Sequence, residues 1–173
     1  WRPADLVETA VAWKNAVCSK ITPTCLIFSR QGTSAIGRTP EQISAIEMGG
    51  YLLKEKKDND ITIVASGSEV QLALDAAKEL ENKSINANVV SMPSLDIFLQ
   101  QSSEFQKMVI DPNKPVLVVE CAHPNSWYKI LNRSDKVIGI ETFGESAPGG
   151  ELLEHFGFNK EKVIQAAKSL IDD

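Results

Sequence analysis

The sequence lacks the long apolar run, of roughly 20 residues, that a membrane-crossing helix needs. It shows no basic-then-apolar leader of the kind that signal peptides carry. Its 18 Lys and Arg are outnumbered by 23 Asp and Glu, and the lysines are scattered, so no basic patch for nucleic-acid phosphates is predicted. Its three cysteines include no CxxC pair, which predicts neither a disulfide framework nor a zinc site. We therefore expect a reduced, cytoplasmic protein that binds neither membrane nor nucleic acid.

The common short catalytic motifs are missing too. The chain contains no GxSxG, HExxH, DxDxDG or Walker sequence and only two histidines, His123 and His155. Cys121 and His123 are close in the sequence, but residues two apart on an extended chain do not necessarily reach each other, so a nucleophile with its base is disfavoured. His155 lies in ELLEHFGF, which predicts a structural role at a packed helix end.

What the sequence does contain is a regular alternation of strand and helix patterns. Such alternation predicts an α/β fold of three layers, with helices on both faces of a mostly parallel sheet of roughly five strands. The strands are predicted at 24–28, 51–54, 60–65, 87–92, 115–120 and 136–140. The helices are predicted from Asp5 as N-cap to Lys20, around 41–47, over 69–83, within 93–110, around 125–131 and over 159–171.

The stretch TCLIFSRQ, residues 24–31, raises a question about Arg30. Its continuous apolar run predicts a strand that is covered on both faces, with Arg30 just past the carboxyl end. Ligands of open α/β sheets bind outside those strand ends, which favours an anion-binding role. On local sequence alone, however, a solvated side chain or half of a surface ion pair is the more common role for such an arginine.

Two glycine-containing loops resemble phosphate sites only weakly. ASGSEV, residues 65–70, follows a strand and begins a helix, but an N-cap at Ser68 explains its composition without a ligand. GESAPGGEL, residues 144–152, similarly needs no more than the start of a helix after Pro148.

Taken together and in order, several segments resemble the carboxyl-terminal part of the transketolase family. The resemblance covers essentially the whole chain and rests on WRPAD, ETA, SRQ, GGY, ITIVASGSEV, VVSMPS, KVIGIETFG and SAPGGEL. It implies that residues 1–45 are the tail of a pyrimidine-binding domain for thiamine diphosphate and that 46–173 form the C-terminal domain. A chain that opens with Trp1 in the middle of this pattern is expected to be a piece of a longer protein.

The resemblance also implies a function. Transketolases move a two-carbon ketol unit from a ketose phosphate, xylulose 5-phosphate, to an aldose phosphate, ribose 5-phosphate or erythrose 4-phosphate, in the pentose phosphate pathway. They act as homodimers with thiamine diphosphate and magnesium or calcium, and the motifs that hold this cofactor and metal lie upstream of Trp1. The arginine of SRQ binds the sugar phosphate in this family, so that role falls on Arg30.

By the same reasoning the chain has no catalytic, cofactor or metal residue of its own and is expected to be inactive alone. Alternatives are a noncatalytic dimerisation module, a module that binds a regulatory nucleotide, or part of a dihydroxyacetone synthase. The chain departs from the family pattern at Glu141-Thr142, where an Asp-Arg pair is common, and at Gly149, where alanine is common. Both departures bear on regulatory binding more than on chemistry.

Overall fold

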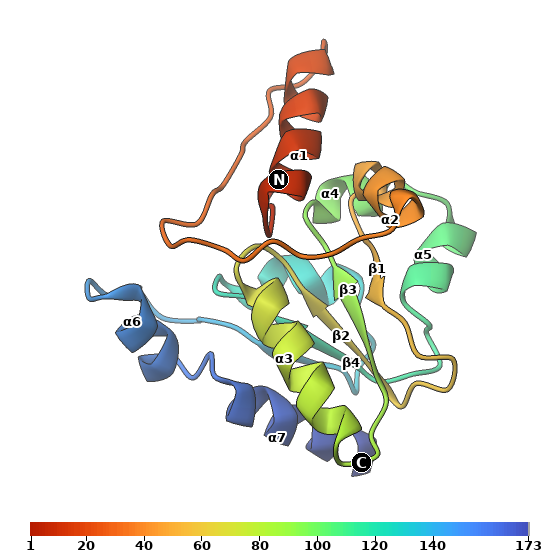
Figure 1. The fold of residues 1–173 in the computed structure, drawn as a ribbon, viewed down its shortest axis with the longest axis vertical. Coiled ribbons are helices and arrows are strands. Elements are labelled where there is room, and N and C mark those ends of the chain that lie inside the picture. The colour runs from red at the N-terminus through yellow and green to blue at the C-terminus, as the bar shows by residue number, and fades with distance from the viewer. Residues whose placement is uncertain (173) are drawn as a thin grey trace.

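The computed structural model describes residues 1–172, which form a single β-sheet surrounded by helices (Figure 1). In chain order the elements are α1 (Leu6–Cys18), α2 (Pro40–Ala45), the 3-10 helix η1 (Ile46–Met48), β1 (Tyr51–Lys54), β2 (Ile61–Ala65), α3 (Glu69–Glu81), β3 (Ala87–Ser91), α4 (Leu95–Phe98), α5 (Ser103–Val109), β4 (Val116–Val119), the 3-10 helix η2 (Pro124–Lys129), β5 (Lys136–Ile138), α6 (Gly149–His155) and α7 (Lys160–Asp172).

The sheet has five strands in the order β1-β3-β2-β4-β5, which confirms the predicted fold class. β2 pairs in parallel with β3 and with β4, and β4 pairs in parallel with β5. Only the edge strand β1 runs antiparallel, against β3. Because the chain moves outward on one side from β2 to β3 and on the other from β4 to β5, the sheet has a topological switch point between β2 and β4.

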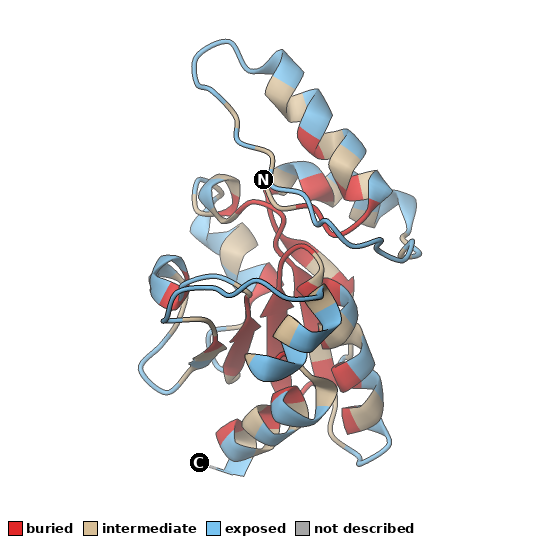
Figure 2. Cartoon of the chain, turned by 90° about the vertical axis from the view of Figure 1, so that its left-hand side faces the viewer, coloured by how far each residue is buried: buried red, intermediate tan, exposed pale blue. Residues whose placement is uncertain are grey.

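Two hydrophobic cores lie on opposite faces of the sheet, as a three-layer fold requires. One is built from alternate residues of the strands, such as Ile63 and Leu117, against the apolar faces of α3 and α7. The other holds Val64 and Val118 against Phe98 of α4 and Trp127 of η2. Figure 2 shows the strands mostly buried, in red, while the helices are exposed on their outer faces.

Most elements lie where the sequence patterns predict them, and Asp5 is the N-cap of α1 as expected. The helix predicted within 93–110 is two short helices, α4 and α5. The one predicted around 125–131 is the 3-10 helix η2. No helix among residues 1–172 is both long and apolar enough to cross a bilayer.

The predicted strand at 24–28 is wrong. Residues 24–28 run extended but form no ladder, and Cys25, Ile27 and Phe28 are exposed rather than buried. Their apolar pattern is that of a strand, but within residues 1–172 no strand lies beside them to complete a sheet.

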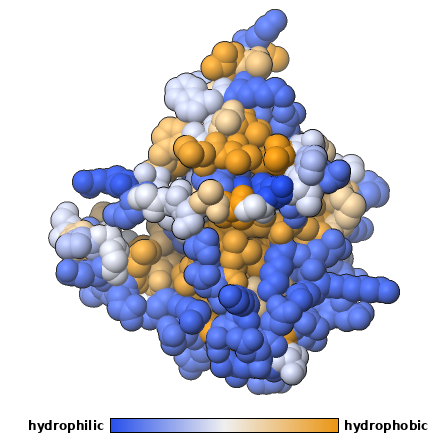
Figure 3. Space-filling view, in the orientation of Figure 1, coloured by the Kyte–Doolittle hydropathy of each residue, from blue (hydrophilic) through white to orange (hydrophobic). Residues whose placement is uncertain are grey.

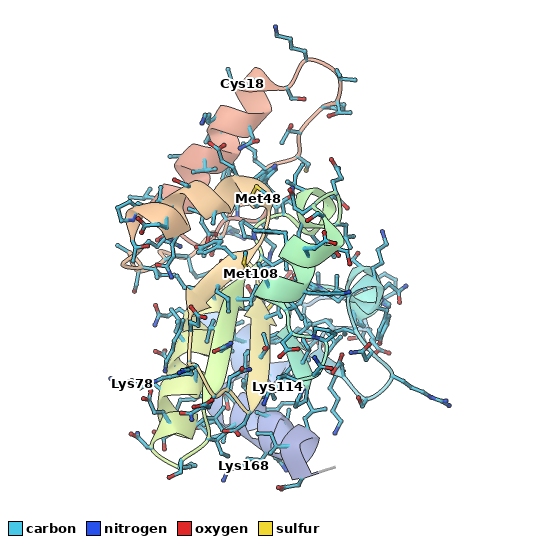
Figure 4. The ribbon with its side chains drawn as sticks, turned by 90° about the vertical axis from the view of Figure 1, so that its right-hand side faces the viewer. Cys18, Met48, Lys78, Met108, Lys114 and Lys168 are labelled. Atoms are coloured by element: carbon cyan, nitrogen blue, oxygen red, sulfur yellow. The ribbon has the colours of Figure 1, made fainter. Side chains whose placement is uncertain are left out.

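This segment and α1 form an arm, residues 6–35, whose α1 end stands away from the sheet at the top of Figure 1. Residues 29–31 of the arm return to the strand ends, where they line a cavity together with Ser68 and Cys121. Cys18 lies at the far end of α1, remote from the strands (Figure 4). Apolar residues gather on the upper and central part of the face in Figure 3, whereas the lower part is mostly hydrophilic. The large exposed apolar side chains of the arm are Leu6, Trp13, Val17, Ile21, Ile27 and Phe28.

Candidate functional site at the carboxyl ends of the strands

The crevice at the switch point, where open α/β sheets generally bind ligands, is filled by the chain's own Arg2. The residues around it follow the two strands that diverge there. Ser66 and Gly67 come after β2, and Glu120 comes after β4. The Glu69 side chain reaches the same place from the first turn of α3.

Both ends of the Arg2 guanidinium are held by carboxylates. Its Nη2 donates to the two carboxylate oxygens of Glu69, each at 2.7 Å. Its Nη1 donates to Glu120 Oε1 at 2.6 Å and to Ser66 Oγ at 2.9 Å. Ser66 in turn donates to Glu120 Oε2 at 2.8 Å. The fork geometry of arginine suits such paired acceptors, and a lysine would match them less well.

The pKa values of Arg2 and Glu120 are both shifted in this mostly buried place. Burial disfavours the charged form of Arg2, but the neighbouring Glu69 and Glu120 outweigh it, so the pKa of Arg2 is raised. For Glu120, burial is the largest influence and raises the pKa, with Glu69 adding to the effect and Arg2 opposing it. The raised pKa of Glu120 is the expected result of burial next to a second carboxylate.

The loop after β2 is shaped around Arg2 rather than around a helix cap. Ser68 is the N-cap residue of α3, as predicted, but its side chain makes no capping hydrogen bond. Its hydroxyl donates instead to Glu69 Oε2, at 3.0 Å. Gly67 has a φ of +57°, and a Cβ there would meet Cγ of Arg2 at 3.0 Å. The glycine therefore lets the arginine side chain lie directly against the loop.

Arg30 is exposed and lines a cavity of about 490 Å³ beside this crevice. Across residues 1–172, the structure gives its guanidinium no hydrogen bond or ion pair. The cavity lies between the SRQ segment and the loop that leads to α6. Its other lining residues include Ser29, Gln31, Ser68, Cys121, Ile140, Gly144, Glu145, Ser146 and Leu152. A free guanidinium at the wall of an open cavity is suited to an anionic ligand.

Cys121 and His123 do not form a nucleophile and base. The backbone N–H of Cys121 donates to Glu69 Oε1 at 3.0 Å. Burial first, and the Glu69 carboxylate second, raise the pKa of the Cys121 thiol, which suppresses its reactive thiolate. His123 Nδ1 accepts from the backbone of Asn125 at 3.3 Å, as the N-cap of η2.

On the far wall of the cavity, α6 carries the second histidine. His155 ends α6 and lies 3.5 Å from the Glu145 carboxylate, with both side chains more than half exposed. The prediction of a packed position for His155 is therefore wrong. Gln31 packs against Gly149 so closely that a Cβ there would overlap its side-chain amide. The departure from the family pattern at Gly149 thus lies at the cavity wall.

No group of three or more His, Cys, Asp or Glu residues that could hold a metal ion occurs in the described part of the chain. The acidic residues that come together, Glu69 and Glu120, are already engaged by Arg2. These residues therefore do not fit a divalent metal with a diphosphate.

Sequence reasoning missed the central part of this site. The sequence patterns gave Glu120 no role, and Arg2 entered only as part of the WRPAD motif. Arg2 is separated from Glu69 by 67 residues and from Glu120 by 118. The sequence does place two acidic residues, Glu69 and Glu120, after the carboxyl ends of two buried strands. Buried carboxylates need a cationic partner, so this placement could have indicated one.

A family model described as the transketolase-like C-terminal domain matches residues 49–159. Transketolase 2 of Vibrio parahaemolyticus is 42% identical over 173 residues, which is 99% of this chain and 26% of that protein. The chain thus spans about a quarter of the length of the curated relatives it matches.

Solved structures of transketolases are similar to this chain as well. A Pichia stipitis transketolase in complex with sedoheptulose 7-phosphate superposes with a TM-score of 0.91 at 38% identity, over 99% of this chain and 25% of that one. A split-gene transketolase, described as an inactive β4 tetramer, gives a TM-score of 0.71 at 26% identity, over 99% of this chain and 57% of that one.

Proposed function

The chain belongs to the transketolase family, and on that premise we propose that it is the carboxyl-terminal part of an enzyme that transfers a two-carbon ketol unit between sugar phosphates. The donor is xylulose 5-phosphate and the acceptor is ribose 5-phosphate or erythrose 4-phosphate, in the cytoplasmic pentose phosphate pathway. The similarity to a relative solved with sedoheptulose 7-phosphate supports a sugar phosphate as ligand.

Arg30 carries this proposal. Its guanidinium is exposed at a cavity of about 490 Å³, and it can offer a phosphate two parallel N–H donors. Because arginine stays charged at every physiological pH, the contact would not depend on protonation. Arg30 would hold the phosphate end of both ketose and aldose while residues outside this chain carry out the chemistry.

The cofactor would be held elsewhere, since residues 1–172 offer no donor set for the metal. When bound, thiamine diphosphate supplies the carbanion that carries the two-carbon unit. We propose that residues 1–45 complete a pyrimidine-binding domain of the longer protein and that 46–173 form its C-terminal domain. The exposed apolar side chains of the arm support the first part, because a domain tail would bury them. The longer protein would act as a homodimer.

The 173-residue chain alone would be inactive. A split-gene transketolase, of whose chain this protein covers 57%, is described as an inactive β4 tetramer, which supports this expectation. An assay of the chain with thiamine diphosphate, Mg²⁺ and sugar phosphates should therefore give no ketol transfer.

The test of the substrate role uses Arg30→Ala in the longer enzyme. We expect KM for xylulose 5-phosphate to rise about 30-fold, and KM for unphosphorylated xylulose to stay the same, because only the phosphate contact is lost. Arg133→Ala, at an exposed arginine outside the cavity, is the matched control for the loss of one positive charge. Equal KM values for Arg30→Ala and the wild type would refute the assignment.

A regulatory nucleotide at the switch-point crevice is less well supported. The approach to Gly67 is occupied by the Arg2 side chain, and both carboxylates there would repel a polyphosphate.

A further inference from the structure

We propose that Arg2 is a positioning residue for Arg30. Its side chain acts as a latch in the switch-point crevice and holds residues 25–31 over the carboxyl ends of β2 and β4. The inference rests on the proposed phosphate role of Arg30 and adds to it the means by which that side chain is held in place. The term Arg2 latch denotes Arg2 with Ser66, Glu69 and Glu120.

The backbone of Arg2 is fixed on both sides. Its N–H donates to the carbonyl of Pro93, after β3, at 2.7 Å, and its carbonyl accepts from the N–H of Gly67, after β2, at 3.0 Å. Together with the side-chain contact to Glu120, after β4, one residue bridges the carboxyl ends of three neighbouring strands. Its position is therefore tied to the three buried central strands of the sheet.

The side-chain contacts make the position specific. The guanidinium donates to Ser66, Glu69 and Glu120, and the side chains of Glu69 and Glu120 are 1% and 6% exposed. Removing the arginine would leave two buried carboxylates without a cation, which is costly. In this conformation the guanidinium contacts both carboxylates at once.

The segment that carries Arg30 is attached to Trp1, the residue that precedes Arg2. The carbonyl of Trp1 accepts from the N–H of Ile27 at 2.8 Å, and the nitrogen of Trp1 donates to the carbonyl of Cys25 at 2.7 Å. These are the hydrogen bonds of a short pairing between residues 1 and 25–27. Arg30 follows three residues after Ile27.

Two cavities show where this pairing places the segment. Arg2, Ser29, Ser68 and Cys121 line both the cavity of Arg30 and a neighbouring one of about 290 Å³. The segment thus lies over the loops that follow β2 and β4. Because residues 24–28 have no strand beside them in residues 1–172, the pairing with Trp1 is their main backbone attachment there. Loss of the latch would free the segment and, with it, Arg30.

The experiment compares the 173-residue chain with the variant Arg2→Met/Glu69→Gln/Glu120→Gln, which removes all three charges and so leaves no buried charge unpaired. Arg2→Lys is a second variant that keeps the positive charge but not the fork. Arg133→Ala is the control. Amide hydrogen exchange at Ile27 reports the pairing, and exchange at Val118 in β4 reports whether the sheet is intact. A titration with inorganic phosphate, followed at the Nε–H signal of Arg30, reports binding.

In the triple variant we expect amide exchange at Ile27 to become about tenfold faster, while Val118 stays protected. We also expect the phosphate affinity to fall about tenfold, because a freed segment must be ordered on binding. For Arg2→Lys, both the exchange rate at Ile27 and the phosphate affinity should lie between those of the triple variant and the wild type. Unchanged exchange at Ile27, or faster exchange with unchanged phosphate affinity, would overturn the latch. If the triple variant loses protection at Val118, its sheet is no longer intact, and the comparison is then made between Arg2→Lys and the wild type. The same two results in Arg2→Lys would then overturn the latch. The proposed function fails separately, if phosphate binds the wild type and Arg30→Ala equally.

Discussion

Arg38 donates from Nη2 to Glu8 Oε1 across 3.1 Å, and both side chains are completely closed to solvent. The same carboxylate oxygen accepts from the hydroxyls of Tyr51 and Ser91, each at 2.6 Å. Arg38 also donates from Nη1 to Asp5 Oδ2 at 2.6 Å. This buried network joins α1 and the segment before α2 to β1 and β3, so it determines how the arm leaves the sheet.

Replacing Arg38 should destabilise the protein strongly. We expect Arg38→Met to lower the free energy of unfolding by about 3–5 kcal/mol, because Glu8 and Asp5 would remain buried without their cation. Urea denaturation of both proteins measures the difference. Lys14→Ala breaks a solvent-exposed pair with Glu47 and should leave the midpoint nearly unchanged. Similar midpoints for Arg38→Met and Lys14→Ala would contradict the role of the network.

The pH dependence of stability should reflect Asp5. Burial opposes ionisation, but hydrogen bonds from Arg38 and the backbone outweigh it and lower the pKa of Asp5 below its ordinary value of 3.8. The unfolded state therefore takes up the proton first, so this contribution is present above pH ~3.8 and is lost as the pH falls through the lowered pKa.

Asp5→Asn tests this directly, because asparagine is as good an N-cap as aspartate but carries no charge. We expect its free energy of unfolding to decline less steeply with acid than that of the wild type. Asp58→Asn, at an exposed carboxylate, should retain the wild-type slope. Parallel curves for Asp5→Asn and the wild type would show that Asp5 contributes nothing to the acid response.

Gly49 should not tolerate a side chain. Its φ is +85°, and a Cβ there would overlap the carbonyl oxygen of Ser94 and the amide nitrogen of Phe98. Because both obstacles are backbone atoms, we expect Gly49→Ala to cost about 2 kcal/mol or more. Gly150→Ala is the control, since a Cβ at this position in α6 would have open space, and it should be neutral or stabilising by about 0.5–1 kcal/mol. Thermal denaturation compares them, and equal melting temperatures would be incompatible with this packing.

The three cysteines should differ in reactivity. Cys18 and Cys25 are exposed, whereas burial and Glu69 raise the pKa of Cys121. With iodoacetamide at mildly alkaline pH, we expect Cys121 to be modified at least about tenfold more slowly than the other two. Peptide mass mapping over time gives the three rates, and in denaturant they should converge. Fast modification of Cys121 in the native protein would disprove its protected position.

The sequence by itself determined the elements whose pattern is local. The short, mostly apolar run at Ile61–Ala65 is typical of a buried strand, and the apolar spacing of Glu69–Glu81 is typical of a helix. Both are recognisable without tertiary contacts. The family motifs added Arg30 as a candidate phosphate ligand, since the order of motifs along the chain is also a property of the sequence.

Tertiary structure decided what depends on distant partners. The apolar run at 24–28 has the pattern of a buried strand, yet it forms none, because a strand requires a neighbouring strand to accept its hydrogen bonds. Ser68 occupies the predicted N-cap position of α3, yet its hydroxyl donates to the Glu69 carboxylate and not to the helix backbone. The Arg2 latch joins residues from three remote parts of the sequence, and no local pattern encodes that meeting. It arises only when the sheet brings the carboxyl ends of β2 and β4 together, where buried carboxylates require a cation.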